Sequence, residues 1–180
     1  MQFARHMLTA TFVVGAVSAA AQALDPCADG VRYFKARDYA AARPLLERCV
    51  EAHPENLEAL LALTVVATSQ ESFAVAVGYG ERLVAAAPQD ANARYWYGRA
   101  LLGAGRAAEG QAQWEAGLEL SQTHRGILEG LARLALERGE EAKAYNLVNQ
   151  LRMHGGDEGW VHRLLADIAR RRNLWDQAAE

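Results

Sequence analysis

Residues 33–56 read YFKARDYAAARPLLERCVEAHPEN, and this stretch decides the fold because its pattern recurs along the chain. Pro54 and Pro88 mark a period of about 34 residues, and steps of that length bring like residues into register. One series of positions holds only small residues, namely Gly30, Thr64, Gly98, Ala132 and Ala166. A second series is also small throughout, namely Ala42, Ala76, Gly110, Ala144 and Ala178. We therefore expect one structural unit to repeat with this period.

Each unit is expected to contain two helices. Every member of the second small series follows its counterpart in the first by the same short interval, and turn-forming residues separate the two in every unit. These turns are expected at Arg37-Asp38, 69–71, Gly105-Arg106, Arg138-Gly139 and Arg172-Asn173. Alanine supplies 37 of the 180 residues and glycine 15, whereas only 4 residues are proline, and this balance favours closely packed helices over sheets. Because one helix pair cannot bury its apolar face alone, the pairs must stack into a solenoid.

The stretch 33–56, together with residues 101–121 (LLGAGRAAEGQAQWEAGLELS), resembles the tetratricopeptide repeat family in period, small-residue pairs and terminal prolines. The resemblance covers about residues 24–180. It implies an all-α, right-handed α-solenoid of stacked antiparallel helix pairs. Four full repeats are expected, with a partial fifth, and they lie near residues 23–56, 57–90, 91–124, 125–158 and 159–180.

The chain departs from the family pattern at a few positions. Gly80 stands where the second helix normally carries a large aromatic residue, and Gln122 and Gly156 replace the closing proline. Pro44 falls inside the predicted second helix of the first repeat, where it removes one hydrogen bond. A local kink is expected there.

Residues 1–23 are expected to be a signal peptide. Arg5 and His6 precede an apolar run over residues 7–21, and residues 21–23 supply a small-x-small cleavage site that ends at Ala23. The run is shorter than the roughly 20 residues that a membrane-spanning helix needs. An uncleaved anchor is the alternative. We expect an exported, periplasmic chain with no stable membrane anchor after cleavage.

The two cysteines of the chain, Cys27 and Cys49, are a candidate disulfide in an exported protein. They are equally far from Asp38 along the sequence, one on each side, so they occupy the same height on two antiparallel helices. Free thiols and a redox-active pair are the alternatives, although the chain has no C-x-x-C motif. Cys27 also falls on the helix stripe described below as the groove, which would aim it away from Cys49.

Composition and motifs argue against catalysis and nucleic-acid binding. A formal charge of -3 gives the chain no bulk attraction for phosphate backbones. Residues 103–108 match G-x-G-x-x-A, but a predicted helix precedes them, so a dinucleotide site is not expected. The histidines are scattered, and no serine stands beside both a base and an acid. We expect no catalytic residue, no metal and no cofactor.

A surface stripe on the first helices remains as the candidate site. Helical spacing places Cys27, Val31 and Phe34 on one stripe, separate from the small-residue face. At the period of the repeat this stripe continues through residues 61, 65 and 68, then 95, 99 and 102, then 129, 133 and 136, then 163, 167 and 170. The family resemblance puts first helices on the concave side, which makes this stripe the groove. The candidate partner-binding residues are Phe34, Leu61, Val65, Tyr95, Arg99, Leu102, Arg133, Arg163 and Arg170.

The stripe changes from apolar to mostly basic along the array, which suits a peptide with an apolar anchor and acidic groups. The alternative is that Phe34, Leu61 and Leu102 are simply core residues. We expect an interaction module that acts as scaffold or assembly adaptor for a cell-envelope protein complex. The alternatives are a self-associating scaffold that forms a homodimer and, less favoured, a thiol-disulfide oxidoreductase.

Overall fold

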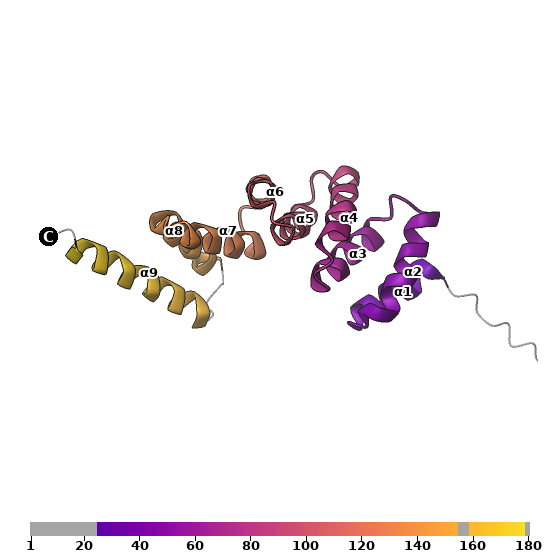
Figure 1. The fold of residues 1–180 in the computed structure, drawn as a ribbon, viewed down its shortest axis with the longest axis horizontal. Helices are drawn as coiled ribbons and strands as arrows, with labels where there is room; N and C mark the ends of the chain where they lie inside the picture. Colours follow the sequence, from indigo (N-terminus) through magenta and orange to yellow (C-terminus); the bar gives the residue numbers. More distant parts are fainter. Residues whose placement is uncertain (1–24, 155–158, 179–180) are drawn as a thin grey trace, which may run out of the picture.

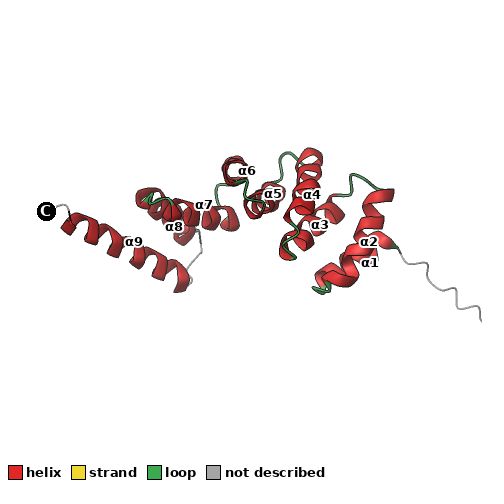
Figure 2. Ribbon diagram, viewed as in Figure 1, coloured by secondary structure: helices red, strands yellow, loops and turns green. Residues whose placement is uncertain are grey.

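The structure, a computed structural model, describes residues 25–154 and 159–178. The predicted signal peptide therefore lies outside the described residues. Within these residues the chain forms nine helices and no strand (Figure 1, Figure 2). The helices are α1 (Pro26–Lys35), α2 (Tyr39–Ala52), α3 (Leu57–Ser69), α4 (Phe73–Ala86), α5 (Ala91–Gly103), α6 (Ala107–Leu120), α7 (Arg125–Glu137), α8 (Glu141–Met153) and α9 (Gly159–Ala178). The prediction of an all-α solenoid of helix pairs is confirmed.

The helices begin at regular intervals along the sequence. The first helices α3, α5, α7 and α9 start at equal steps, and the second helices α2, α4, α6 and α8 start at steps of the same length. This step is the period that separates Pro54 from Pro88. The two helices of each pair pack against one another, and each pair packs against the next. The result is an elongated row that runs from α1 and α2 to α9 (Figure 1).

Small residues form the contact between the two helices of a pair. Ala42, Ala76 and Ala144 on the second helices are all fully buried, with 0% exposure. In the third pair two glycines meet, since a Cβ atom on Gly110 would lie 2.8 Å from the carbonyl oxygen of Gly98. Only short side chains allow helices to approach this closely. The small residues of the third pair therefore face one another as the sequence predicts, whereas Gly30 of the first pair approaches Leu46 of α2.

Four of the five predicted turns are present, and each contains one residue in the left-handed backbone region. These residues are Arg37 (φ 61°), Glu71 (φ 56°), Gly105 (φ 78°) and Gly139 (φ 74°), again spaced at the period of the repeat. Glycine adopts this conformation without steric cost. Arg37 and Glu71 each store about 1 kcal/mol of backbone strain.

The prediction of a fifth turn at Arg172-Asn173 is wrong, because α9 continues through these positions from Gly159 to Ala178. Position 173, one period after Gly139, is asparagine and not glycine. The preceding arginines and the leucine that follows have good helix propensity, so nothing stops the helix there. Ala166 on α9 is exposed, because no second helix covers it in the described part of the chain.

A disulfide between Cys27 and Cys49 joins α1 to α2, with the Cα atoms 4.8 Å apart. Cys49 is fully buried in the apolar cluster of the first two pairs, and Cys27 packs on the same cluster. The side chain of Cys27 therefore faces α2, away from the predicted groove. α2 runs unbroken through Pro44, an exposed residue, and the expected kink stays a prediction.

Two large apolar clusters divide the row. One fills the first two pairs and includes Leu46, Leu60 and Leu83. The other joins Trp114 of α6 to residues of α7, α8 and α9. The joint between α5, α6 and α7 therefore connects two halves of the row.

None of the described helices is both long and apolar enough to cross a membrane.

Candidate functional site

The apolar part of the predicted groove is largely taken up by the protein's own packing. Phe34 and Leu61 are partly buried against the cluster of the first two pairs, and Leu102 is partly buried against the cluster that contains Trp114. Val65 is only 7% exposed, so it offers almost no surface to a partner. These contacts fit the core alternative better than an open apolar groove.

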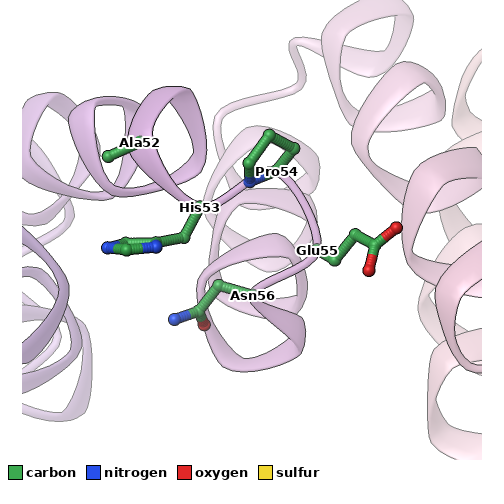
Figure 3. A pocket seen from close by; sticks show the side chains of 5 residues that line it. All are labelled: Ala52, His53, Pro54, Glu55 and Asn56. Atoms are coloured by element: carbon green, nitrogen blue, oxygen red, sulfur yellow. The ribbon is translucent and has the colours of Figure 1, made fainter.

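A hollow of about 510 Å³ lies at the turn between α2 and α3, lined by Ala52, His53, Pro54, Glu55 and Asn56 (Figure 3). His53 and Glu55 point in opposite directions. The side-chain oxygen of Asn56 is occupied as the cap of α3, where it accepts a hydrogen bond from the Ala59 amide at 3.0 Å. Ligand sites need polar groups that converge. We therefore do not regard this hollow as a candidate site.

A second hollow, of about 330 Å³, lies at the joint between α5, α6 and α7. It is lined by Tyr95 and Arg99 from α5, Trp114 from α6, and Gly126, Glu129, Gly130 and Arg133 from α7. Four residues of the predicted stripe, Tyr95, Arg99, Glu129 and Arg133, thus come together at one place from two repeats. We call this the α5–α7 hollow.

Aromatic rings and glycines shape the α5–α7 hollow. The rings of Tyr95 and Trp114 are stacked with centroids 6.2 Å apart, and the Trp114 Nε1–H donates to the Tyr95 carbonyl oxygen at 2.9 Å. Gly126 and Gly130 are separated by about one turn of α7, and so lie on one face of the helix. A Cβ atom on Gly126 would lie 2.7 Å from the Tyr95 ring, and a Cβ on Gly130 would overlap the Trp114 ring. The absence of side chains on this face of α7 therefore lets both rings reach the helix.

The charged groups of the hollow are two arginines and one carboxylate. The Arg99 guanidinium lies over the rings of Trp96 and Tyr95, 5.0 and 5.9 Å from their centroids. Such cation–π contacts favour the position of a guanidinium over the aromatic rings. Arg133 instead donates to Glu129 on its own helix, at 2.9 Å. The hollow is therefore net positive.

The remaining basic residues of the stripe, Arg163 and Arg170, lie exposed on α9 and do not line the α5–α7 hollow. Arg170 donates to Asp167 of the same helix at 2.9 Å. This exposed pair is worth about 1 kcal/mol at most. Both arginines extend the basic part of the stripe beyond the hollow.

His124 stands at the edge of this joint and caps α7. Its Nδ1 atom accepts a hydrogen bond from the Ile127 amide at 3.2 Å, and its ring centroid lies 5.2 Å from that of Tyr95. Burial lowers the pKa of His124 from its ordinary value of 6.5, although the carboxylate of Asp90 acts in the opposite direction. Protonation of Nδ1 would remove the acceptor that caps the helix.

We expect the free energy of unfolding to fall as the pH is lowered below 6.5, in part through His124. The unfolded chain takes up a proton on this residue near pH 6.5, whereas the folded chain resists until the pH is lower, so protonation favours unfolding. His124→Asn keeps a capping acceptor that does not titrate. Urea midpoints at pH 7.5 and 5.5 should differ less for this variant than for the wild type. The assignment to His124 would be contradicted if the midpoints at the two pH values differed equally in His124→Asn and the wild type. It would also be contradicted if the control His53→Asn reduced this difference.

Sequence reasoning missed part of the hollow. It did not assign a binding role to Trp114, Gly126 or Gly130. The signal was the pair of glycines one turn apart inside a predicted helix, where glycine is unfavourable and usually marks a close approach. Glu129 was on the stripe but was not among the predicted binding residues.

No group of His, Cys, Asp and Glu side chains is placed to hold a metal ion in the ranges that the structure describes. Cys49 of the Cys27–Cys49 disulfide is fully buried, so an attacking thiolate could reach this bond only from the side of Cys27. Exchange requires a thiolate to reach a sulfur atom. The α5–α7 hollow, which is lined by aromatic and cationic side chains, is the candidate site.

The chain matches the family model described as tetratricopeptide repeat over residues 27–91 and 69–110. No curated protein matches it. Solved structures with a similar fold include a crystal structure of the MamA protein, with a TM-score of 0.73, 17% identity, and coverage of 86% of this chain and 84% of that one.

Two further structures have similar folds. MamA from Desulfovibrio magneticus RS-1 gives a TM-score of 0.67 at 19% identity, covering 74% of this chain and 76% of that one. PilF from Pseudomonas aeruginosa gives a TM-score of 0.72 at 18% identity, covering 86% of this chain and 70% of that one. At these identities the likeness is one of fold.

Proposed function

Because the chain belongs to the tetratricopeptide repeat family, we propose that it is a non-catalytic interaction module that binds a segment of a partner protein on its first helices. The observation that carries this proposal is the α5–α7 hollow. There, residues from two successive first helices converge on one open space with a fixed aromatic floor and exposed cationic groups. Such a mixture of aromatic and arginine side chains is typical of residues that dominate binding energy.

The hollow is held in shape without a partner. The stacked rings, the Trp114 hydrogen bond and the glycine face of α7 all fix the positions of its walls. A preformed site lowers the entropy that binding must overcome, because fewer side chains need to be ordered. This supports passive recognition of a partner segment.

We propose that the protein acts in the periplasm, or otherwise outside the cytoplasm, as a scaffold or assembly adaptor for a cell-envelope complex. The apolar N-terminal run and its cleavage site at Ala23 support export. The disulfide between Cys27 and Cys49 is consistent with an oxidising compartment. The partner would then be an envelope protein.

The test is a pull-down from envelope extract with the wild type and with Arg99→Glu. Arg99 is the better residue to change, because Tyr95 is packed against Trp114 and its loss would disturb the fold. Arg48→Glu on α2, an exposed charge reversal outside the hollow, is the matched control. We expect Arg99→Glu to reduce recovery of specific partners about tenfold and Arg48→Glu to leave it unchanged. Equal recovery by all three folded proteins would refute the proposed surface.

Self-association is the second candidate. Ala166 is exposed on α9, whereas the equivalent Ala132 is fully buried by its paired helix. A helix from a second copy could cover this face of α9. Light scattering across a concentration series tests the idea, and a monomer at every concentration would eliminate it.

A further inference from the structure

Arg99 is the exposed cation in the α5–α7 hollow that lacks a carboxylate partner. In the part of the chain that the structure describes, its guanidinium has contacts with the Trp96 and Tyr95 rings but no hydrogen bond or ion pair. The guanidinium group is a planar fork of N–H donors, which can donate to a carboxylate in a bidentate manner. The contacts with the two rings restrict this long side chain in the free protein, which lowers the entropy cost of binding.

Glu129 supplies a carboxylate to the same hollow from inside the chain. It accepts a hydrogen bond from Arg133 at 2.9 Å, and its side chain is 32% exposed against 66% for that of Arg133. One of the two arginines of the hollow is thus neutralised by the protein itself, and the other is not. The lining residues leave one positive charge without an opposite charge.

We infer that the α5–α7 hollow seats one acidic side chain of the partner segment on Arg99, and that Glu129 is an internal competitor that weakens this binding. The inference rests on the proposed function and names the chemistry of the partner: an extended peptide with an aspartate or glutamate at the anchoring position. Glu129 holds Arg133 away from the carboxylate of the partner. The negative charge of Glu129 also repels that carboxylate. Binding is strongest when Arg133 turns from Glu129 to the partner.

Size and charge favour a single carboxylate as the occupant. The volume of about 330 Å³ is at the small end of the range for ligand sites, and it suits one side chain with its flanking backbone. The single unpaired positive charge matches one carboxylate. A phosphate group with two negative charges would need two unpaired arginines, but only Arg99 is unpaired among the described residues that line the hollow. The phosphate would also be repelled by the carboxylate of Glu129.

The test begins with a display library of random short peptides. Peptides that bind the full chain are selected from it. Selected peptides are synthesised with a fluorescent label, each also with its acidic residues changed singly to the neutral amide. Their dissociation constants are measured by fluorescence anisotropy against four proteins: the wild type, Arg99→Gln, Glu129→Gln and the control Glu137→Gln. Glu137 is an exposed carboxylate on the same helix, outside the hollow.

We expect one acidic position in the selected peptides at which the change to amide weakens binding to the wild type about tenfold. The same change should have no effect on binding to Arg99→Gln. Glu129→Gln should strengthen binding of the acidic peptide about threefold, whereas Glu137→Gln should not change it.

The outcomes separate this inference from the proposed function. Selected peptides that bind with no acidic preference, or whose acidic residue matters equally with and without Arg99, would overturn the inference and leave a peptide-binding array intact. Unchanged or weaker binding by Glu129→Gln, with a folded protein, would overturn the role of Glu129 as competitor. A library that yields no binding peptide would count against both the inference and the proposed function.

Discussion

Trp114→Ala is expected to lower the free energy of unfolding by about 4 kcal/mol. Trp114 is 5% exposed, stacks on Tyr95 of α5, and fills the face of α7 that Gly130 leaves open. Its indole also donates the hydrogen bond to the Tyr95 carbonyl oxygen. In a stacked array each pair is stabilised by its neighbours, so removal of this contact uncouples the two halves of the row. We therefore also expect α7–α9 to unfold at a lower urea concentration than α1–α5.

Gly130→Ala provides the control for this assignment. In the wild type a Cβ at this position would overlap the Trp114 ring, so the substitution should destabilise by about 2 kcal/mol. In the Trp114→Ala background the ring is gone, and alanine should instead stabilise the helix by about 1 kcal/mol. Urea titrations followed by circular dichroism measure both effects. Additive changes in the double variant would show that Trp114 and Gly130 are not in contact.

The double substitution Cys27→Ala with Cys49→Ala is expected to cost about 3 kcal/mol in stability on the chain-entropy model. The disulfide closes a loop with a sequence separation of 22 residues and joins the first helix of the row to the second. α1 has a neighbour on only one side, because α2 and α3 are its packing partners in the described residues. The loss should therefore concentrate in α1, which would exchange its amide hydrogens faster.

Hydrogen exchange of the wild type with and without a reductant separates the disulfide from the side-chain change. Reduction should accelerate exchange in α1 and α2 and leave α7 and α8 unchanged. Protection of α1 that is the same in the oxidised and the reduced protein would contradict a stabilising role for the bond. A uniform loss of protection along the whole row would contradict the local character that stacking predicts.

The periodic features of the fold could be predicted from the sequence. Small residues at Ala42, Gly98 and their equivalents recur because helix pairs need a close approach at the same place in every unit. Gly105 and Gly139 mark turns because the chain requires a left-handed residue there. These constraints act over one helix or one turn, so single residues reveal them.

The α5–α7 hollow was only partly predictable, since it depends on contacts between helices. Helical spacing placed Tyr95 and Arg99 on one face, but it could not show that Trp114 fills the joint, or that Gly130 receives its ring. The burial of Val65 likewise depends on how neighbouring pairs are packed together. The continuation of α9 through Asn173 shows that a turn also needs a residue that stops the helix.

The most direct test of the binding surface is site-specific photo-crosslinking in the envelope of the producing cell. A photoreactive residue is placed at Glu129 in the α5–α7 hollow, where binding does not need the native side chain, and in a second chain at Tyr145, which is 38% exposed on α8. We expect a discrete crosslinked partner from position 129 and none from position 145. A partner captured from position 145 and not from position 129 would contradict recognition by the first helices.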